Sequence, residues 1–381
     1  MGRVLLLLLA AVSLVAVGAA PGADLFAPLG DVYQVIRSYY YRAQEVEDND
    51  LLHGALRGMI DALGDPYSAF FDPQEYAQWQ DSLVGEYSGV GMEITVRDGK
   101  VTVVAPLPGT PAEEAGIQAG DWIKAVDGQS TEGWSLEQAS QQIRGQEGTV
   151  VTLTVEHPDG TAQEVVITRA RIHVDPVRAE YLEEEQVGYV RLLRFDFDTA
   201  AELGRALYGF PLDSLRGVVL DLRNNPGGVL SAAVAVASYF VDEGTVVQTK
   251  GAHPGTRTYA SSGNSFPNVP VAVLVNQGTA SASEIVAGAI QDRGVGVLVG
   301  RPTFGKGLIQ EFVMRLPDGS AVKLTTGEYF TPAGNPVQDV GLAPDIPVDA
   351  EDSPSADQDP DLAAALAWIS SRAGQPVGAG E

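Results

Sequence analysis

The sequence predicts a multidomain α/β protein, because three stretches of the chain differ in the pattern of their apolar residues. Residues 24–82 have helical periodicity, residues 84–170 combine short strands with two helices, and residues 171–350 mix apolar strands with helices. A chain of 381 residues, 45% of them apolar, can bury more than one core. Its 43 glycines and 23 prolines indicate many tight turns, which argues against a helical bundle.

The first twenty residues have the pattern of an export signal. Arg3 precedes an apolar run from Val4 to Val17, and small residues follow before Pro21. The run is short for a membrane-spanning helix, yet an uncleaved membrane anchor stays open beside a cleaved signal peptide. We therefore expect the rest of the chain to work outside the cytoplasm, in the periplasm or at the extracytoplasmic face of the cell membrane.

Residues 24–82 are predicted to form three helices. Gly64 ends the second helix, and Asp72 with Glu75 forms a capping box for a third that begins at Pro73. The apolar stripes of the first two helices are Val32, Val35, Ile36, Tyr39 and Tyr40, and Leu52, Ala55, Leu56, Met59, Ile60 and Leu63.

Residues 84–170 are predicted to form a compact unit of short strands. Alternating apolar residues flank turns at Asp98-Gly99 and Asp159-Gly160, which indicates two hairpins. Ser135 and Gln138 form a capping box that begins a helix. A loop of small residues precedes the first strand, and its N–H groups could bind the carboxylate of a peptide that pairs with the strand edge. The loop residues are Ser88, Gly89, Val90, Gly91 and Met92.

Residues 171–350 are predicted to contain a sheet of apolar strands with helices between them. We expect strands at 187–193, 217–222, 269–276, 295–299, 310–316 and 321–329, and helices near 198–208, 229–240 and 281–291. Residues 351–381 have the pattern of an acidic linker and a C-terminal helix capped by Asp359.

The composition excludes several classes of function. The chain has 50 Asp and Glu residues against 24 Lys and Arg residues, a net charge of −26 that repels nucleic acid and anionic lipid. It has no cysteine, which excludes disulfides, cysteine nucleophiles and iron–sulfur clusters. The four histidines lack the spacing of metal ligands, so we expect neither a metal nor a cofactor.

Ser281 is a candidate nucleophile. It follows the apolar strand Val271–Val275 and begins a helix, whose free N–H groups could bind an oxyanion. Ser281 with Glu284 also fits a capping box, and most serines in such a pattern only cap a helix. The spacing alone favours the cap.

Lys306 is a candidate base, since the sequence has neither a Gly-x-Ser-x-Gly elbow nor a His-Asp arrangement. A lysine can act as a base if burial lowers its pKa from about 10.4 to about 7–8. The flanking glycines, Gly305 and Gly307, allow a sharp bend, although the side chain could equally point into water. Gln310 would return beside Lys306 if one helical turn followed the bend, but would be too distant on an extended strand.

Residues 221–228 (DLRNNPGG) run from a buried strand into a turn with a glycine pair. The N–H groups of Gly227 and Gly228 could approach an oxyanion closely, while an ordinary well-built turn explains the pattern about equally well. Asp221 and Arg223 could be no more than a structural ion pair.

Residues 300–306 match the GxxxxGK pattern of a phosphate-binding loop. Gly307 stands where such a loop needs Ser or Thr as a magnesium ligand, and strand-like sequence follows instead of a helix. We interpret the match as chance and expect no magnesium-dependent ATP binding.

These segments, in this order, resemble the carboxyl-terminal processing peptidases, also called tail-specific proteases. The resemblance covers nearly the whole chain after the first twenty residues, and its later stretches are long and specific. It implies an N-terminal helical segment, a PDZ domain and an α/β serine protease core related to the ClpP and crotonase class. The matching stretches are GALRGM (54–59), GVG (89–91), DLRNNPGG (221–228), VNQGTASASEIVAGAIQD (275–292), TFGKGLIQ (303–310) and LTTGEYFTPAGNPVQDVGLAPDI (324–346).

The resemblance also implies roles for individual residues. The nucleophile, the base and the assisting glutamine of the family fall on Ser281, Lys306 and Gln310. The N–H groups of the oxyanion hole fall on the residue after the nucleophile and on one glycine of the pair, between which the sequence does not choose: Ala282, with Gly227 or Gly228.

The implied function is that of an exported serine endopeptidase, whose PDZ domain recruits proteins by their apolar C-terminal tails and can gate the catalytic site. A catalytically silent PDZ scaffold for exported proteins is the alternative, although a scaffold needs none of Ser281, Lys306 and Gln310. The sequence leaves open a homodimer through the N-terminal helices, an activating partner protein, and anchoring in a membrane through the N-terminus.

Overall fold

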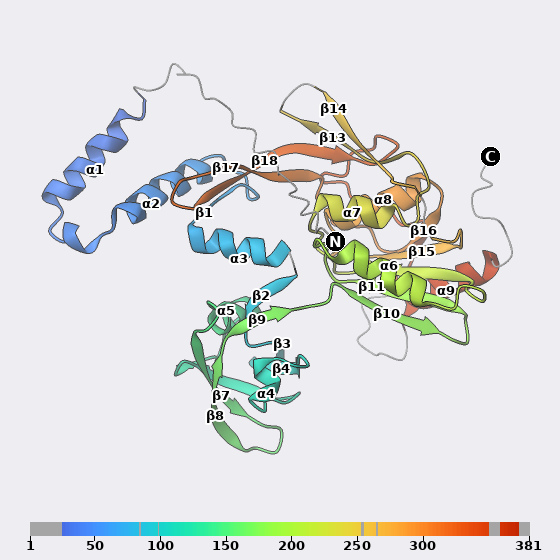
Figure 1. The fold of residues 1–381 in the computed structure, drawn as a ribbon, viewed down its shortest axis with the longest axis horizontal. Helices are drawn as coiled ribbons and strands as arrows, with labels where there is room; N and C mark the ends of the chain where they lie inside the picture. The colour runs from blue at the N-terminus through green and yellow to red at the C-terminus, as the bar shows by residue number, and fades with distance from the viewer. Residues whose placement is uncertain are drawn as a thin grey trace, which may run out of the picture. The chain divides into compact units, whose positions relative to one another are not determined.

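The computed structural model describes residues 25–83, 85–97, 99–252, 255–263, 266–349 and 359–372, which form two compact units divided between Asp65 and Pro66 (Figure 1). The predictions for residues 1–20 and for the acidic linker at 351–358 lie outside the described residues. No helix in the described ranges is both long enough and apolar enough to cross a bilayer.

The first unit is a pair of helices, as the periodicity predicted. Its elements are α1 (Ala27–Tyr39), the short 3-10 helix η1 (Ala43–Glu45) and α2 (Asp48–Asp61). Arg37 joins them, because its guanidinium donates to the carbonyl of Val46 over 2.8 Å and forms an ion pair with Asp48. Several apolar side chains of α1 and its flanks are exposed, among them Leu25, Phe26, Val32, Val35 and Tyr39.

The second unit begins with a strand and a helix that pack on its core. β1 (Ala69–Phe71) pairs with β18 (Ala321–Phe330), and α3 (Pro73–Leu83) follows. The predicted capping box of α3 is confirmed, since Asp72 N–H donates to Glu75 Oε2 over 2.9 Å and Glu75 N–H donates to Asp72 Oδ1 over 2.8 Å. Trp79 of α3 packs on Phe312, with ring centroids 4.3 Å apart.

A compact set of short strands with two helices follows, as predicted. The strands β3, β4, β5, β7 and β8 pair antiparallel in this order, and β6 pairs with β5. The predicted helix cap is confirmed by reciprocal bonds between Ser135 and Gln138, at 2.9 and 3.2 Å. The elements are β3 (Met92–Arg97), β4 (Lys100–Pro106), α4 (Pro111–Glu114), β5 (Trp122–Val126), β6 (Gln129–Ser130), α5 (Leu136–Ile143), β7 (Val150–Glu156) and β8 (Ala162–Thr168). The strand β2 (Glu86–Gly89) precedes this set in the chain, the strand β9 (Ala170–His173) follows it, and the two pair with each other.

The core of the second unit is a mostly parallel sheet. Its strand order is β10-β11-β12-β15-β16-β19, and β10 alone runs antiparallel to its neighbour. Every residue of β12 and β15 is buried, which is typical of parallel strands covered on both faces. The strands are β10 (Val177–Leu182), β11 (Val187–Leu192), β12 (Gly217–Asp221), β15 (Val271–Val275), β16 (Gly296–Gly300) and β19 (Ile346–Pro347).

Helices and a second sheet cover this core in layers. Alternate residues of β12 divide between two faces: Val218 and Leu220 pack with α6, α7 and α8, while Val219 packs with α9. The helices α7 and α8 lie between the parallel sheet and the sheet of β13, β18 and β14 (Figure 1). These elements are α6 (Thr199–Gly209), α7 (Leu230–Ala237), β13 (Thr245–Gly251), β14 (Thr256–Ala260), α8 (Ala282–Asp292), β17 (Leu308–Arg315) and α9 (Pro360–Arg372).

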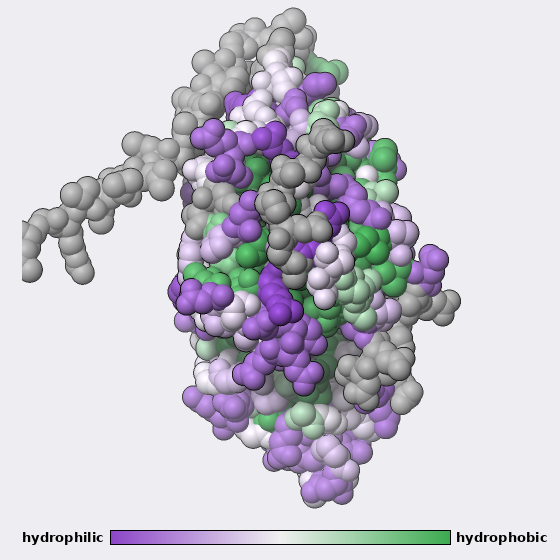
Figure 2. All heavy atoms as spheres, turned by 90° about the vertical axis from the view of Figure 1, so that its right-hand side faces the viewer, coloured by the Kyte–Doolittle hydropathy of each residue, from purple (hydrophilic) through white to green (hydrophobic). Residues whose placement is uncertain are grey.

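Arg223 ties the C-terminal helix to the sheet. Its guanidinium binds Asp221 at 2.7 Å, Asp359 at 2.8 Å and Asp361 at 3.2 Å. The carboxylate of Asp359 also caps α9 by accepting the N–H of Leu362 over 3.0 Å, as predicted. Asp221 and Arg223 therefore form the structural ion pair that the sequence left as one alternative. Hydrophilic side chains spread over the face of the molecule in Figure 2, in keeping with the acidic composition.

Candidate active site

Two turns meet at one edge of the parallel sheet, where β12 and β15 end. Because these strands are parallel neighbours, residues 222–228 and residues 276–281 emerge at the same edge. Thr279 Oγ1 donates to the carbonyl of Leu222 over 2.9 Å. A hydroxyl of the second turn therefore holds the backbone of the first.

Three asparagines lock the two turns together. The side chain of Asn276 accepts from Asn224 N–H over 2.9 Å and donates to Asn224 Oδ1 over 3.0 Å. The side chain of Asn225 donates to the carbonyl of Leu192 over 2.8 Å. The backbone carbonyl of Asn225 accepts the N–H of Ala280 over 3.0 Å. The polar turn is rigid because its amides satisfy one another and the neighbouring backbone.

Ser281 joins β15 to α8 in a backbone conformation that is rare for a residue with a side chain, with φ +55° and ψ −118°. Such a conformation costs roughly 1–3 kcal/mol and persists only where surrounding contacts enforce it. The side chain is partly exposed, whereas Ala282–Ile290 of the helix are buried. A strained strand-to-helix turn that presents a hydroxyl at the sheet edge favours a nucleophile over a simple cap.

Glu284 connects the Ser281 turn with the segment that carries Lys306. Its side chain is fully buried in the first turn of α8. Oε2 accepts the N–H of Ser281 over 2.8 Å and the N–H of Lys306 over 2.9 Å. Oε1 accepts the N–H of Gly305 over 2.8 Å and the hydroxyl of Thr303 over 2.6 Å. One carboxylate therefore binds donors from two segments that are distant in the sequence.

This shared acceptor fixes how closely the two candidate catalytic residues approach. Both N–H groups reach the same oxygen, so the backbone nitrogens of Ser281 and Lys306 are separated by less than the sum of the two distances. Hydrogen bonds to a buried carboxylate are charge-assisted and therefore strong. The Ser281 turn and the Lys306 segment are held as one structure.

Tyr329 of β18 supports the same junction. Its hydroxyl donates to the carbonyl of Ser281 over 3.0 Å, lies 3.5 Å from Glu284 Oε2 and contacts the carbonyl of Lys306. Burial, together with the charge of Glu284, raises the pKa of Tyr329 far above its usual range. The hydroxyl therefore stays protonated and keeps its role as a donor.

Lys306 follows β16 in the bend before β17 and is partly buried. Burial lowers the pKa of Lys306, and the negative charge of Glu284 opposes part of this decrease. Its Nζ lies 4.7 Å from the ring centroid of Tyr67, and no hydrogen bond joins it to Ser281, although both residues are described. The effect of burial is in the direction that a lysine base requires.

Gln310 does not return to Lys306 through a helical turn. The bend leads directly into β17, which pairs with β18 and is irregular between Ile309 and Gln310. Gln310 Nε2 donates to Thr325 Oγ1 over 3.4 Å. The condition that the sequence reasoning set for Gln310 is therefore not met. The same strand confirms that no helix follows residues 300–306.

The two glycines of the turn differ in their hydrogen bonds. Gly227 N–H donates to Asn225 Oδ1 over 2.9 Å, whereas the N–H groups of Gly228 and Ala282 make no hydrogen bond to any residue in the described ranges. A Cβ atom on Gly227 would lie 2.8 Å from both Ala282 N and Ser281 Cβ. Gly227 therefore packs against the serine turn, and Gly228 against the backbone of Phe195, in a way that no side chain would allow.

Three models of known protein families match successive parts of the chain. Residues 186–348 match peptidase family S41, and residues 102–157 match the PDZ domain. Residues 19–75 match the N-terminal domain of the activating protease CtpB.

Curated relatives extend the similarity over most of the chain. The carboxy-terminal-processing protease of Bartonella bacilliformis is 37% identical over 329 residues, which cover 85% of this chain and 75% of that protein. The carboxyl-terminal-processing protease of Picosynechococcus sp. is 40% identical over 311 residues, which cover 80% and 75%. The chain belongs to peptidase family S41.

A solved member of the family has the same fold. The photosystem II D1 C-terminal processing protease is 33% identical, has a TM-score of 0.54, and the match covers 84% of this chain and 92% of that one. Membership in family S41 confirms the resemblance drawn from the sequence and the predicted fold class. The chain is a serine-type protease with a PDZ domain.

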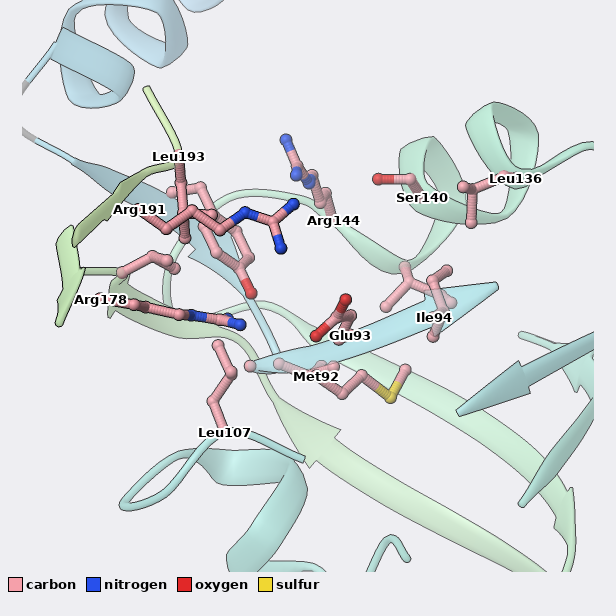
Figure 3. Close-up of a pocket in the computed structure, with 15 residues that line it drawn as sticks. Met92, Glu93, Ile94, Leu107, Leu136, Ser140, Arg144, Arg178, Arg191 and Leu193 are labelled. Atoms are coloured by element: carbon pink, nitrogen blue, oxygen red, sulfur yellow. The ribbon is translucent and has the colours of Figure 1, made fainter. Parts of the chain in front are cut away.

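In this S41 protease the predicted carboxylate loop divides into two parts. Ser88 and Gly89 belong to β2 and pair with β9. Val90, Gly91 and Met92 form the turn into β3 and line a cavity of about 440 Å³ (Figure 3). The last three residues therefore line the cavity, whereas the first two belong to the strand pair that precedes it.

Gly91 is the residue of this turn that only glycine can fill. Its φ is +82°, and a Cβ atom there would lie 2.3 Å from the Cβ of Thr110. The carbonyl of Gly91 accepts the Thr110 hydroxyl over 2.8 Å and the N–H of Leu107 over 2.9 Å. Its N–H makes no hydrogen bond to the described part of the chain, so it is available to a ligand.

Sequence reasoning missed two functional groups of the S41 site. Glu284 was interpreted only as half of a capping box, because nothing in the sequence brings Thr303–Lys306 to the same carboxylate. Tyr329 lies in the matching stretch at residues 324–346, but no role was predicted for it. The available signal was a glutamate within an otherwise apolar helix. If the helix is buried, as it is here, such a carboxylate needs several donors.

Proposed function

We propose that this S41 protease cleaves exported proteins with Ser281 as the nucleophile and Lys306 as the general base, and that the PDZ domain captures the C-terminal tails of its substrates. The activity belongs to the class of serine endopeptidases. The curated relatives are named for carboxyl-terminal processing, which favours substrates recognised by their tails.

The carboxylate of Glu284 is the observation that carries the proposal. Its Oε2 accepts the backbone N–H of Ser281 and that of Lys306, and the described segments that form this edge, residues 222–228, 276–281 and 303–310, contain no histidine. A structural cap would need only the bond to Ser281. The second bond, to Lys306, has a purpose if the two side chains act together.

The reaction begins when the neutral amine of Lys306 takes the hydroxyl proton of Ser281. The Oγ then attacks the carbonyl carbon of the scissile peptide, and the carbonyl oxygen becomes an oxyanion. As the C–N bond breaks, the ammonium of Lys306 returns the proton to the leaving amine and an acyl-enzyme remains. A water molecule then gives a proton to Lys306 and attacks the carbonyl carbon of the ester. As the ester C–O bond breaks, Lys306 returns this proton to Oγ of Ser281, and the acid product is released.

Two backbone N–H groups are proposed to hold the oxyanion. Gly228 and Ala282 offer donors without an acceptor in the described ranges, whereas the N–H of Gly227 is already bonded to Asn225. We therefore assign the role to Gly228 rather than Gly227. Donors fixed before the reaction contribute most when they face developing charge in a dry site.

The amine of Lys306 must move to reach Ser281, because it lies over the ring of Tyr67 and not on the hydroxyl. The attraction between an ammonium and an aromatic face is about 0.5–2 kcal/mol, which substrate binding can outweigh. Gln310, which the family resemblance assigns to assist the lysine, would need the same rearrangement to leave Thr325.

Residues outside the catalytic edge suggest where and with whom the protease works. The apolar segment at residues 4–17 supports export, with catalysis in the periplasm or at the extracytoplasmic face of the cell membrane, either freely or on an N-terminal anchor. Exposed apolar side chains of α1 support a homodimer through the N-terminal helices. The match to the CtpB N-terminal domain supports an activating partner protein.

Cleavage of an unfolded protein with an apolar tail tests the proposal, with wild type, Ser281→Ala and Lys306→Ala compared in the presence of a chelator. Ser283→Ala and Lys100→Ala are matched controls, because Ser283 is buried beside the nucleophile and Lys100 lies on the PDZ hairpin. We expect wild type and both controls to cleave, and the two test variants to fold but not to cleave.

Other outcomes separate the alternatives. If Ser281→Ala cleaves as fast as wild type, the nucleophile is assigned wrongly. If no variant cleaves but all bind the tail, the chain acts as a PDZ scaffold unless a partner activates it.

A further inference from the structure

The cavity at the PDZ domain is walled by two parts of the second unit. The PDZ part contributes β3, the Gly91 turn and α5, and the protease core contributes the β10–β11 hairpin through Arg178 and Arg191. Apolar side chains line its floor and far end: Met92, Ile94, Leu107, Leu136, Ile143 and Leu193. A peptide tail that pairs with β3 would therefore lie against the core as well as against the PDZ domain.

Arg178 and Arg191 are direct cross-strand neighbours in the β10–β11 hairpin. Figure 3 shows both guanidinium groups extending from the hairpin into the cavity, Arg178 toward the beginning of β3 and Arg191 on the side of Arg144. Neither side chain makes an ion pair with a described residue, and the Nε–H of Arg191 is buried without an acceptor there. Two like charges directly opposite one another destabilise a sheet, so this pair needs a compensating group.

The acidic groups near the arginines do not supply that compensation. Asp221 is in register with Arg191, but its two oxygens bind Arg223 and the hydroxyl of Tyr189. Glu93 of β3 is the one carboxylate among the residues that line the cavity, and it forms no ion pair with either arginine. Arg144 lines the cavity as well, and its guanidinium lies 4.7 Å from the ring centroid of Tyr87. In a chain with a net charge of −26, a cavity lined by three arginines and one carboxylate favours an anionic ligand.

We infer that this cavity selects C-terminal tails that carry an acidic side chain in their last three residues, in addition to the terminal carboxylate. The N–H of Gly91 receives the terminal carboxylate, the apolar floor takes a neighbouring side chain, and Arg178 with Arg191 binds the acidic side chain. Guanidinium groups suit this ligand, since they bind carboxylates through paired hydrogen bonds. The inference rests on the proposed capture of tails and names the class of tail.

Binding of labelled peptides to full-length Ser281→Ala protein tests this inference. Four decapeptides are compared, with an apolar end or with one Glu at the penultimate position, each as a free acid and as a C-terminal amide. We expect the Glu peptide acid to bind about tenfold more tightly than the apolar acid at low salt. This preference shrinks as salt is raised, because screening weakens exposed charge pairs.

Variants of the arginines locate the effect. Arg178→Gln with Arg191→Gln should abolish the preference for Glu and leave affinity for the apolar acid within about twofold. The matched control, Arg97→Gln with Arg257→Gln, removes two exposed arginines that do not line the cavity and should keep the preference. Glu93→Gln removes the opposing charge and should raise affinity for the Glu peptide by about threefold.

The outcomes distinguish this inference from the proposed function. If apolar tails bind and wild type cleaves their carriers, but Glu gives no preference, the inference is wrong and the proposed function stands. If the Glu peptide amide binds as tightly as the apolar acid, and the Glu peptide acid binds no more tightly than either, the two carboxylates compete for one place. The arginines then bind the terminal carboxylate, and the inference is also wrong. If Glu93→Gln weakens binding of every tail, the arginines serve Glu93 instead of a ligand.

Discussion

The proposed catalytic edge of this S41 protease, where Ser281 and Lys306 lie, differs from the PDZ cavity in how its charged side chains are bonded. At the catalytic edge one buried carboxylate, Glu284, is bonded on both oxygens, and every contact is internal to the chain. In the cavity Arg178 and Arg191 face each other without an ion pair in the described ranges. The first arrangement fixes a geometry in advance, and the second leaves room for a ligand.

This difference teaches which residues should affect which step. Buried, satisfied groups hold the reacting atoms, so their loss should change turnover and folding. Unpaired groups at an open cavity contribute when a ligand arrives, so their loss should change affinity. The two regions should therefore respond to different substitutions and in different measurements.

Lys306→Ala should have the largest effect. Loss of the general base is expected to lower kcat by about 10²–10⁴-fold while tail affinity stays within about twofold. The rate is measured on the unfolded substrate, and affinity by polarisation of a labelled tail peptide. A variant that keeps more than half of the wild-type kcat would show that Lys306 is not the base.

Glu284→Gln should have the next largest effect on turnover. The amide cannot accept hydrogen bonds through its nitrogen, so two of the four donors lose their partner and the fold loses about 3 kcal/mol. We expect kcat to fall by about 10²-fold.

The pH profile of this variant separates positioning from simple loss of structure. Glu284 raises the pKa of Lys306, so its removal should move the acidic limb of kcat to lower pH. A lower kcat with an unmoved limb would mean that Glu284 acts through folding alone.

Gly91→Ala should disable the cavity without touching the catalytic edge. The added methyl group would meet Thr110 at a positive φ, so the turn must shift and tail affinity should fall by at least about tenfold. Cleavage of a short peptide without a recognised tail, measured on the same preparation, should stay unchanged. If short-peptide cleavage falls equally, the two regions are coupled, and the claim that they respond to different substitutions is wrong.

The wild-type pH dependence follows from the neutral form of Lys306. On the acidic limb the fraction of neutral amine rises about tenfold for each pH unit, and kcat rises with it. Because burial lowers the pKa of Lys306, the plateau should begin below the ordinary lysine value of about 10.4. A kcat that shows no rising acidic limb below this value would contradict the role of Lys306.

Tyr329→Phe should have the smallest effect. It removes one hydrogen bond to the carbonyl of Ser281, which contributes about 1 kcal/mol, so kcat should fall about fivefold. The acidic limb of the profile should not move, because Tyr329 stays protonated. A shift of that limb, measured against Tyr259→Phe as a control on β14, would show that the hydroxyl tunes Lys306 itself.

Local sequence rules predicted much of the fold. Buried apolar runs indicated β11, β12, β15, β16 and β18, and capping residues located the starts of α3, α5 and α9. The strands β1, β10, β13 and β14 were missed. β1 is only three residues long, and exposed polar residues such as Arg257 interrupt the apolar pattern of β14. Such strands form because a partner strand is present, which local periodicity does not report.

The residues of the candidate site likewise fall into those that local sequence could indicate and those that depend on the tertiary structure. Ser281 and Lys306 could be named because each lies in a distinctive local motif. The role of Glu284 could not be predicted, since it depends on where the chain returns after the helix. The pairing of Arg178 with Arg191 depends on the register of the β10–β11 hairpin, which the sequence alone left open. The helical turn that would have brought Gln310 to Lys306 is absent for a related reason, since pairing with β18 keeps its segment extended.

Trapping the acyl-enzyme tests the central claim most directly. Wild type is mixed with an activated ester of an apolar peptide, quenched in acid within the first turnover and digested for mass spectrometry. The account predicts one acyl adduct on Ser281, formed faster as the pH rises, absent from Ser281→Ala and strongly reduced in Lys306→Ala. An adduct on another residue, or equal acylation of Lys306→Ala and wild type across the pH range, would contradict it.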